Sequence, residues 1–200
     1  MKKLIMAGSV CIVLAFASSR ALGGFGLSDV GGLALGTVTA ASLDKDLNGG
    51  SDSFASAYTH YTKAFQIATN LGPAIALVNS MNAQVKDRVE AYKNLNENVK
   101  SNADYMIKNK IPLSAEQEAE IKSGDMDLAK GITKWAAVGT ALGIAASQKG
   151  GQDPALMAAI PVAAEFIKQL PEIKDMSSEM GKLHKAQKEL KKELAKNKKP

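Results

Sequence analysis

Hydrophobic residues recur at intervals of three and four along most of this chain, the spacing that places side chains on one face of an α-helix. The first such stripe runs from residue 52 to about residue 100 and opens with Phe54, Tyr58, Tyr61 and Phe65. Gly72-Pro73 interrupts it, so the pattern predicts either one long kinked helix or two helices. We expect the aromatic face to belong to the core, with stacking on a ligand as the alternative.

The most apolar stretch, residues 134–170, predicts a helical hairpin. Its first arm carries no charge from Trp135 to Ser147, and its second arm begins at Asp153-Pro154. Asp accepts hydrogen bonds from the free N–H groups of a first turn, and Pro fits the first helical position. Each arm is shorter than the about 20 residues that span a bilayer, so we expect the hairpin in the core. Contact with a membrane or an apolar ligand is the alternative, and it would involve Trp135, Leu142 and Ile144.

A last helix is predicted from Glu172 to about Asn197. Its apolar residues follow a heptad-like seam with Gln187 as the polar member: Ile173, Met176, Met180, Leu183, Leu190 and Leu194. Such a seam pairs with a second helix, either the stripe from Ile75 to Val99 or another protein. The predicted partner-binding residues are Met180, Leu183 and Leu190, with Lys185, Lys188 and Lys192 on the basic face.

Proline, glycine and helix-capping residues mark where helices end and begin between about residue 100 and residue 134. The residue before Pro112 is pushed out of the helical region, so a helix ends there. Ser114 and Gln117 have the spacing of a capping box. Ser123-Gly124 is expected to end the short helix that follows, and Asp125 to cap the next. We interpret Glu116, Glu118 and Glu120 as a solvated face.

The N-terminus has the pattern of an export signal. Lys2 and Lys3 precede a short apolar run, Leu4–Phe16, and small residues follow. This predicts a signal peptide over residues 1–21 with cleavage after Ala17 or Ala21, and an uncleaved anchor is the alternative. The only cysteine, Cys11, falls within it, so the mature chain has no thiol or disulfide. We expect a bacterial periplasmic or secreted protein.

Residues 22–50 are predicted to form a separate, glycine-rich N-terminal segment. Ser28 or Asp29 can cap a helix from about Val30 to Leu43. Glycines inside such a helix cost about 0.5–1 kcal/mol each relative to alanine. The helix therefore needs close packing, for example against residues 135–147, and a flexible arm is the alternative.

A partial calcium-loop pattern follows at residues 44–55. Asp44, Asp46, Asn48 and Asp52 match oxygen-ligand positions of a D-x-D-x-N-G loop. The twelfth position, where a bidentate glutamate belongs, is Ala55. We therefore prefer a polar turn in which Ser51 or Asp52 caps the next helix.

Composition fits a helical fold. Hydrophobic residues make up 46% of the 200 residues and aromatic residues only 5%, and no window alternates with the period of a strand. We predict an all-α, single-domain bundle of five or six helices with the hairpin at its core. Residues 51–181 are expected to form the bundle and residues 172–200 an amphipathic, lysine-rich C-terminal helix.

The net charge of +5 conceals an uneven distribution. Residues 182–200 alone hold eight lysines against two glutamates. With the cations of the predicted signal and this basic tail both set aside, residues 22–181 are mildly acidic. The basic tail suits an anionic lipid or envelope polymer. Nucleic acid is not expected, because no aromatic residues are interleaved to stack bases.

The sequence shows no pattern typical of catalysis or of a bound cofactor. The only histidines are His60 and His184, and nucleotide-binding glycine loops and nucleophile-elbow motifs are absent. We predict a non-enzymatic binding or structural protein of the cell envelope that uses its C-terminal helix, by self-association or with another protein. A membrane-active or lipid-binding protein is the alternative. An enzyme would need a concave site gathering His60 or His184 with carboxylates.

Overall fold

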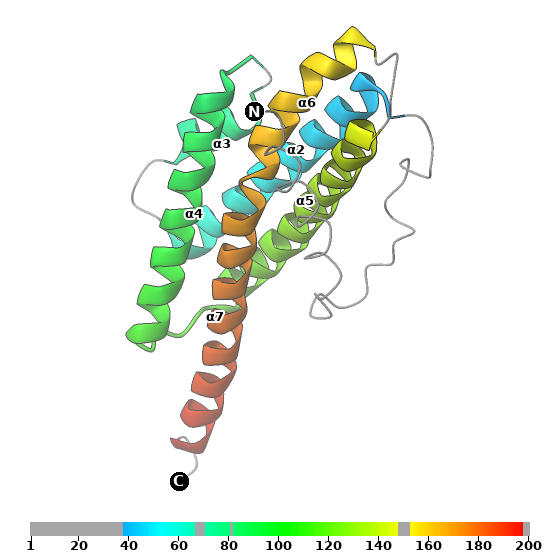
Figure 1. The fold of residues 1–200 in the computed structure, drawn as a ribbon. Coiled ribbons are helices and arrows are strands. Elements are labelled where there is room, and N and C mark those ends of the chain that lie inside the picture. Colours follow the sequence, from blue (N-terminus) through cyan, green and yellow to red (C-terminus); the bar gives the residue numbers. More distant parts are fainter. Residues whose placement is uncertain (1–37, 67–70, 81, 148–152, 198–200) are drawn as a thin grey trace, which may run out of the picture.

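The computed structural model describes residues 38–66, 71–80, 82–147 and 153–197. The predicted signal peptide and the glycine-rich segment up to residue 37 lie outside this part of the chain. The described residues form an all-α bundle of six helices (Figure 1), as predicted: α2 (Ala40–Phe65), α3 (Gly72–Val78), α4 (Val85–Lys108), α5 (Ala115–Ser147), α6 (Pro154–Ile167) and α7 (Leu170–Asn197).

The antiparallel pair of α2 and α5 forms the most extensive helix contact in the bundle. Glycines on each helix face aromatic rings on the other. A Cβ atom at Gly50 would lie 2.2 Å from Cδ1 of Trp135, and one at Gly131 would lie 2.5 Å from Cε1 of Phe54. Carbon atoms do not pack so closely, so only glycine fits at either place. A step of four residues along α2 is thus matched by a step of four in the opposite direction along α5.

An aromatic cluster occupies the centre of the bundle. The rings of Phe54, Tyr92, Trp135 and Phe166, from α2, α4, α5 and α6, are all fully buried. Trp135 lies 4.8 Å from Phe54, 5.2 Å from Tyr92 and 5.7 Å from Phe166 between ring centroids. Tilted and edge-to-face rings at these distances add attraction to the burial of apolar surface. The predicted core role of the aromatic face of α2 is therefore confirmed for Phe54.

Helix α2 begins earlier than predicted. The backbone N–H of Ser42 donates to Thr39 Oγ1 and that of Thr39 to Ser42 Oγ, both at 3.1 Å, which closes a capping box at Thr39. The helix then runs without a break through residues 48–51. The predicted polar turn, with a cap at Ser51 or Asp52, is wrong, and the predicted domain boundary at residue 51 falls inside α2.

The stripe from residue 52 to residue 100 divides into three helices. After Phe65, Gln66 adopts a left-handed backbone with φ of 50° and ends α2. Pro73 then stands in the first turn of α3, where its missing N–H has no helical partner to lose. The proline therefore begins a helix here and does not kink one.

The predicted break at Ser123-Gly124 is also wrong, because α5 is one helix of 33 residues. A Cβ atom at Gly124 would lie 2.7 Å from the ring of Tyr61. Burying that ring outweighs the about 0.5–1 kcal/mol that glycine costs within a helix. Asp125 is not a helix cap, and its carboxylate accepts a 2.8 Å hydrogen bond from the Tyr61 hydroxyl.

The seam of α7 packs inside the chain, mainly against α4. Its buried residues are Ile173, Met176, Met180, Leu183 and Gln187. Gln187 accepts a hydrogen bond from the N–H of Leu113 at 3.0 Å and donates to the carbonyl of Ile111 at 2.8 Å. The polar residue of the seam thereby satisfies two backbone groups of the α4–α5 connection and fixes where α7 lies along it.

Candidate functional site

The C-terminal end of α7 extends past the helices on which the rest of α7 packs (Figure 1). Met180 and Leu183 are buried within the chain, so the prediction that they form a partner-binding surface is wrong for this fold. Leu190 is half-buried, Leu194 is 44% exposed and residues 191–197 are all exposed. The seam therefore continues past the region where the bundle covers it fully, with Leu190 partly covered and Leu194 exposed.

Lysines surround this exposed part of the seam. Lys191 pairs with Glu118 at 2.5 Å, and Lys110 of the α4–α5 connection lies 3.6 Å from Glu193. Lys185, Lys188, Lys192 and Lys196 are exposed, and none of them has a carboxylate within 4 Å among the described residues. Their spacing of three and four places them along one side of the helix. This side carries positive charge that no carboxylate of the described residues pairs with directly.

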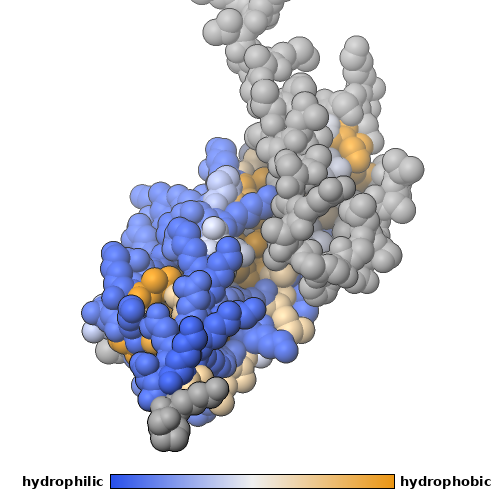
Figure 2. Space-filling view, turned by 90° about the horizontal axis from the view of Figure 1, so that it is seen from below, coloured by the Kyte–Doolittle hydropathy of each residue, from blue (hydrophilic) through white to orange (hydrophobic). Residues whose placement is uncertain are grey.

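A groove of about 240 Å³ lies between the end of α4 and α7. Met106, Ile107 and Leu190 supply its apolar part, and Lys110, Glu189 and Glu193 its charged part. Seen from the end where α7 projects, the surface is largely hydrophilic with a small hydrophobic patch among the polar side chains (Figure 2). An apolar strip with charged edges is the surface that an amphipathic helix contacts.

The apolar hairpin divides between core and surface. Trp135 is fully buried, and its Nε1 donates a 2.9 Å hydrogen bond to the carbonyl of Leu47. Leu142 and Ile144 are half-buried. In this fold Trp135 does not contact a membrane, which corrects that part of the alternative interpretation. The exposed apolar residues of the hairpin lie instead on α6, where Met157 is 53% and Val162 is 40% exposed.

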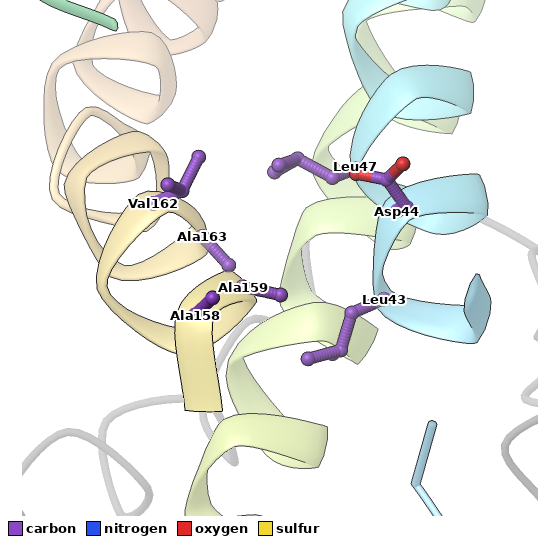
Figure 3. Close-up of a pocket in the computed structure, with 7 residues that line it drawn as sticks. All are labelled: Leu43, Asp44, Leu47, Ala158, Ala159, Val162 and Ala163. Carbon is purple, nitrogen blue, oxygen red and sulfur yellow. The ribbon is translucent and has the colours of Figure 1, made fainter. Parts of the chain in front are cut away.

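A second cavity, of about 260 Å³, separates the start of α2 from α6 (Figure 3). Leu43 and Leu47 point from α2 toward Val162 and the alanines of α6.

Among the described residues, none of the helices combines the length and the hydropathy that a bilayer crossing requires.

The four residues of the partial calcium pattern do not form a loop. Asp44, Asp46, Asn48 and Asp52 all lie on the continuous helix α2. A helix turns successive side chains by 100°, so Asp46 points away from the side that Asp44, Asn48 and Asp52 share. Those three are spread over about two turns of the helix, and the four side chains do not converge on one ion. Within the described residues, no group of three or more His, Cys, Asp or Glu side chains has an arrangement that could hold a metal. The calcium interpretation is therefore wrong for this fold.

Both histidines contact carboxylates of α5. His60 Nδ1 lies 2.5 Å from Glu120 and its Nε2 lies 3.8 Å from Asp127, whose carboxylate accepts a 2.6 Å hydrogen bond from Ser56. A nucleophilic serine would instead donate its proton to the imidazole. Neither His60 nor the residues that it contacts line either of the two cavities described above. Glu120, predicted to belong to a solvated face, joins α5 to α2.

The second histidine joins α7 to α5. His184 Nε2 lies 2.5 Å from Asp125 Oδ2. The hydrogen bond to Asp125 raises the pKa of His184 above its usual range, while partial burial acts in the opposite direction. The same aspartate accepts the hydrogen bond from Tyr61. One carboxylate thus connects α2, α5 and α7.

Stability is expected to depend on pH through this pair. Because the folded state raises the pKa of His184, the imidazolium–Asp125 pair stabilises the fold fully below the unfolded pKa of about 6.5 and loses its contribution as the pH rises through the folded pKa. His184→Gln should therefore cost more at about pH 5.5 than at about pH 9, by less than about 1 kcal/mol because the imidazole is half-exposed. Urea unfolding of both proteins at each pH measures the difference. A cost that grows with pH would contradict this assignment.

Sequence reasoning missed the buried Arg88. Its Nη2 donates to Ser51 Oγ at 3.0 Å and to the Val78 carbonyl at 3.2 Å, and its guanidinium lies 4.3 Å from the Phe166 ring centroid. Burial lowers the pKa of Arg88, and the nearby Tyr92 opposes this. These contacts join α2, α3, α4 and α6 around one cation. Its position four residues before Tyr92, on the apolar stripe, is the pattern that could have predicted its burial.

A scan against protein-family models and searches of curated proteins and of solved structures gave no match.

Proposed function

We propose that this chain is an exported, non-enzymatic binding protein of the cell envelope that engages a protein partner through the projecting end of α7. The export part of the proposal is supported by the charged start, apolar run and small residues of the N-terminus. The binding part is supported by one observation above all. Leu194 continues the buried seam of α7 yet is 44% exposed, so an apolar strip remains for a second helix.

The chemistry of this surface defines the partner. Leu190 and Leu194 require an apolar stripe opposite them, and Lys185, Lys188 and Lys192 require acidic residues along its edge. An amphipathic helix with acidic flanks supplies both. The end of α7 in a second copy supplies the apolar stripe but presents the same lysines, and like charges facing each other oppose association. We therefore propose a different protein, with an acidic amphipathic helix, as the partner.

Site-specific photo-crosslinking in the expressing cells tests this proposal. Leu194→p-benzoylphenylalanine in the full chain is expected to form a covalent adduct with a partner whose crosslinked peptide is acidic and amphipathic. In the same chain, Lys188→Glu together with Lys192→Glu should abolish the adduct. Both lysines are exposed and unpaired within the described residues, so this double change should alter the free energy of unfolding by less than about 0.5 kcal/mol.

Met126 provides the matched control position. Its side chain is also apolar and 47% exposed, but it lies on α5. Equal adducts from photo-probes at Met126 and Leu194, or an adduct at Leu194 that survives charge reversal, would overturn the proposal. An adduct with twice the mass of the chain would identify self-association and would overturn the choice of partner.

The apolar face of α6 supports a second candidate function, contact with lipid acyl chains. The observation in its favour is the exposure of Met157 and Val162 on a helix with no charged residue before Glu165. Trp135 cannot report such contact, because its ring is already buried. Flotation with vesicles of neutral phospholipid should instead be compared between the unchanged chain and Met157→Ser with Val162→Ser. Equal flotation of the two would exclude this face as the lipid contact.

A further inference from the structure

The cavity between α2 and α6 has the chemistry of a docking site for an apolar segment. Its walls are mostly hydrocarbon: Leu43, Leu47, Ala158, Ala159, Val162 and Ala163, with Asp44 as the one charged lining residue. The close-up shows the two leucines of α2 facing Val162 and the alanines of α6 across the gap (Figure 3). Alanine side chains are too short to fill this space.

The surface that continues outward from the cavity is also apolar. Val162 is 40% exposed where it lines the cavity, and Met157, five residues earlier on α6, is 53% exposed. The side chains of Ala158 and Pro161 beside them are exposed too. A contiguous apolar surface of this kind is normally covered by another element.

The chain itself supplies a segment that ends beside this cavity. Helix α2 is preceded by Val38, whose side chain is buried, and Leu43 lies in the first turns of the same helix and lines the cavity. The residues that lead up to Val38 are therefore joined to the bundle at the cavity's own end of the molecule. Residues 22–37 carry a single charge, at Asp29, and contain Phe25, Leu27, Val30, Leu33 and Leu35.

The length of this segment matches the surface. Sixteen residues would span about 24 Å as a helix, and the 14 residues of α6 span about 21 Å. Six of the residues between 22 and 37 are glycine, and glycine lets a backbone approach an alanine-rich helix closely. The predicted position against residues 135–147 is less suitable. Trp135, Val138 and Ala141 of that segment are already buried against other helices of the bundle, so they offer no surface to another segment.

We propose that residues 22–37 dock onto the apolar face formed by α6 and the start of α2, with their leucines in the cavity lined by Leu43, Leu47 and Val162. Covalent attachment at Val38 gives this segment a millimolar effective concentration at the cavity, which neither a second copy nor a lipid has in dilute solution. The proposal is independent of partner binding by α7.

The rate at which a cysteine on this face reacts with a maleimide tests the proposal. In the full chain with Cys11→Ser, Val162→Cys should react at least about tenfold more slowly than Lys185→Cys, because the docked segment must first open. Replacing Leu27, Leu33 and Leu35 with serine should restore fast labelling at position 162. The same change should leave the rate at position 185 unaltered, since Lys185 lies on α7.

Each remaining outcome overturns the proposal. Fast labelling of Val162→Cys in the chain with its native leucines means that the face is uncovered. Slow labelling that survives the three serine substitutions means that another element covers it, and a rate that falls as protein concentration rises identifies a second copy. Slow labelling that appears only with added phosphatidylcholine vesicles identifies lipid as the occupant. Unchanged far-ultraviolet circular dichroism of the triple variant shows that the bundle remains folded.

Discussion

Trp135→Ala is expected to lower the free energy of unfolding by about 3–5 kcal/mol, the range for removing a large aromatic side chain from a core. The ring is fully buried and packs against Phe54, Tyr92 and Phe166. Its removal leaves a cavity among rigid rings and deprives the Leu47 carbonyl of its hydrogen bond from the indole. Since Trp135 is the only tryptophan, urea unfolding should be followed by far-ultraviolet circular dichroism.

A second variant separates the two contributions. Trp135→Phe keeps an aromatic ring but removes the indole N–H, so it should cost less than Trp135→Ala. It still loses the hydrogen bond from the indole to the Leu47 carbonyl, which keeps its bond from Ser51 Oγ. A loss below about 1 kcal/mol for Trp135→Ala would contradict the assignment of this ring to the core of the bundle.

Gly50→Ala is expected to destabilise the protein by about 1–3 kcal/mol, although alanine favours helices over glycine by about 0.5–1 kcal/mol. The added methyl would lie 2.2 Å from Cδ1 and 2.5 Å from Nε1 of Trp135. The indole is surrounded by other rings and cannot move aside without disturbing them. Chemical denaturation followed by tryptophan fluorescence measures the loss.

Gly181→Ala is the matched control for this substitution. Gly181 also lies within a helix, α7, but a Cβ atom there would meet nothing within 4 Å. The same chemical change should therefore stabilise the protein by about 0.5–1 kcal/mol. Destabilisation of similar size at both glycines would show that backbone effects, and not contact with the indole, determine the result at Gly50.

A double-mutant cycle joins the two predictions. Once Trp135 is alanine, a methyl at Gly50 enters empty space, so Gly50→Ala should become neutral or stabilising in that background. The cost of the two changes together would then be clearly less than the sum of the single costs. Additive costs would mean that the two positions do not contact each other.

Several elements could be predicted from the sequence because local chemistry determines them. Asp153 Oδ1 accepts the N–H of Ala155 at the start of α6, and Ser114 and Gln117 form the predicted capping box. The last helix runs from Leu170 to Asn197, close to the predicted bounds. Caps and helix periodicity depend on neighbours within a few residues, so the sequence alone shows them.

Helices α2 and α5 were predicted too short for a tertiary reason. Glycine within a helix and a polar run such as Asn48–Ser51 both resemble a break when only neighbouring residues are considered. In the folded chain, Gly50 and Gly124 face the rings of Trp135 and Tyr61. Packing across the helix pair therefore overrides local propensity, and the distance between the partners, about 60 to 85 residues along the chain, hides this relation from a local pattern.

The candidate site could be predicted only in outline for a similar reason. The heptad spacing correctly identified which residues of α7 share a face, but not how far along the helix the bundle covers that face. Leu183 and Leu194 both belong to the apolar seam of the pattern, yet Leu183 is buried and Leu194 is 44% exposed. Coverage ends near Leu190 because α4 ends at Lys108. Only the arrangement of the helices in space sets that limit.

The interlocking of glycines with rings also constrains how this protein can change over generations. A substitution that enlarges Gly50 or Gly131 is tolerated only if Trp135 or Phe54 has already become smaller, so the two members of each pair must change in order. A one-residue insertion in the middle of either helix would misalign at least one pair. We expect descendants of this chain to diverge freely at exposed lysines while each pair of glycine and ring is inherited as one unit. Recognising them would require comparing pairs of positions and not single positions.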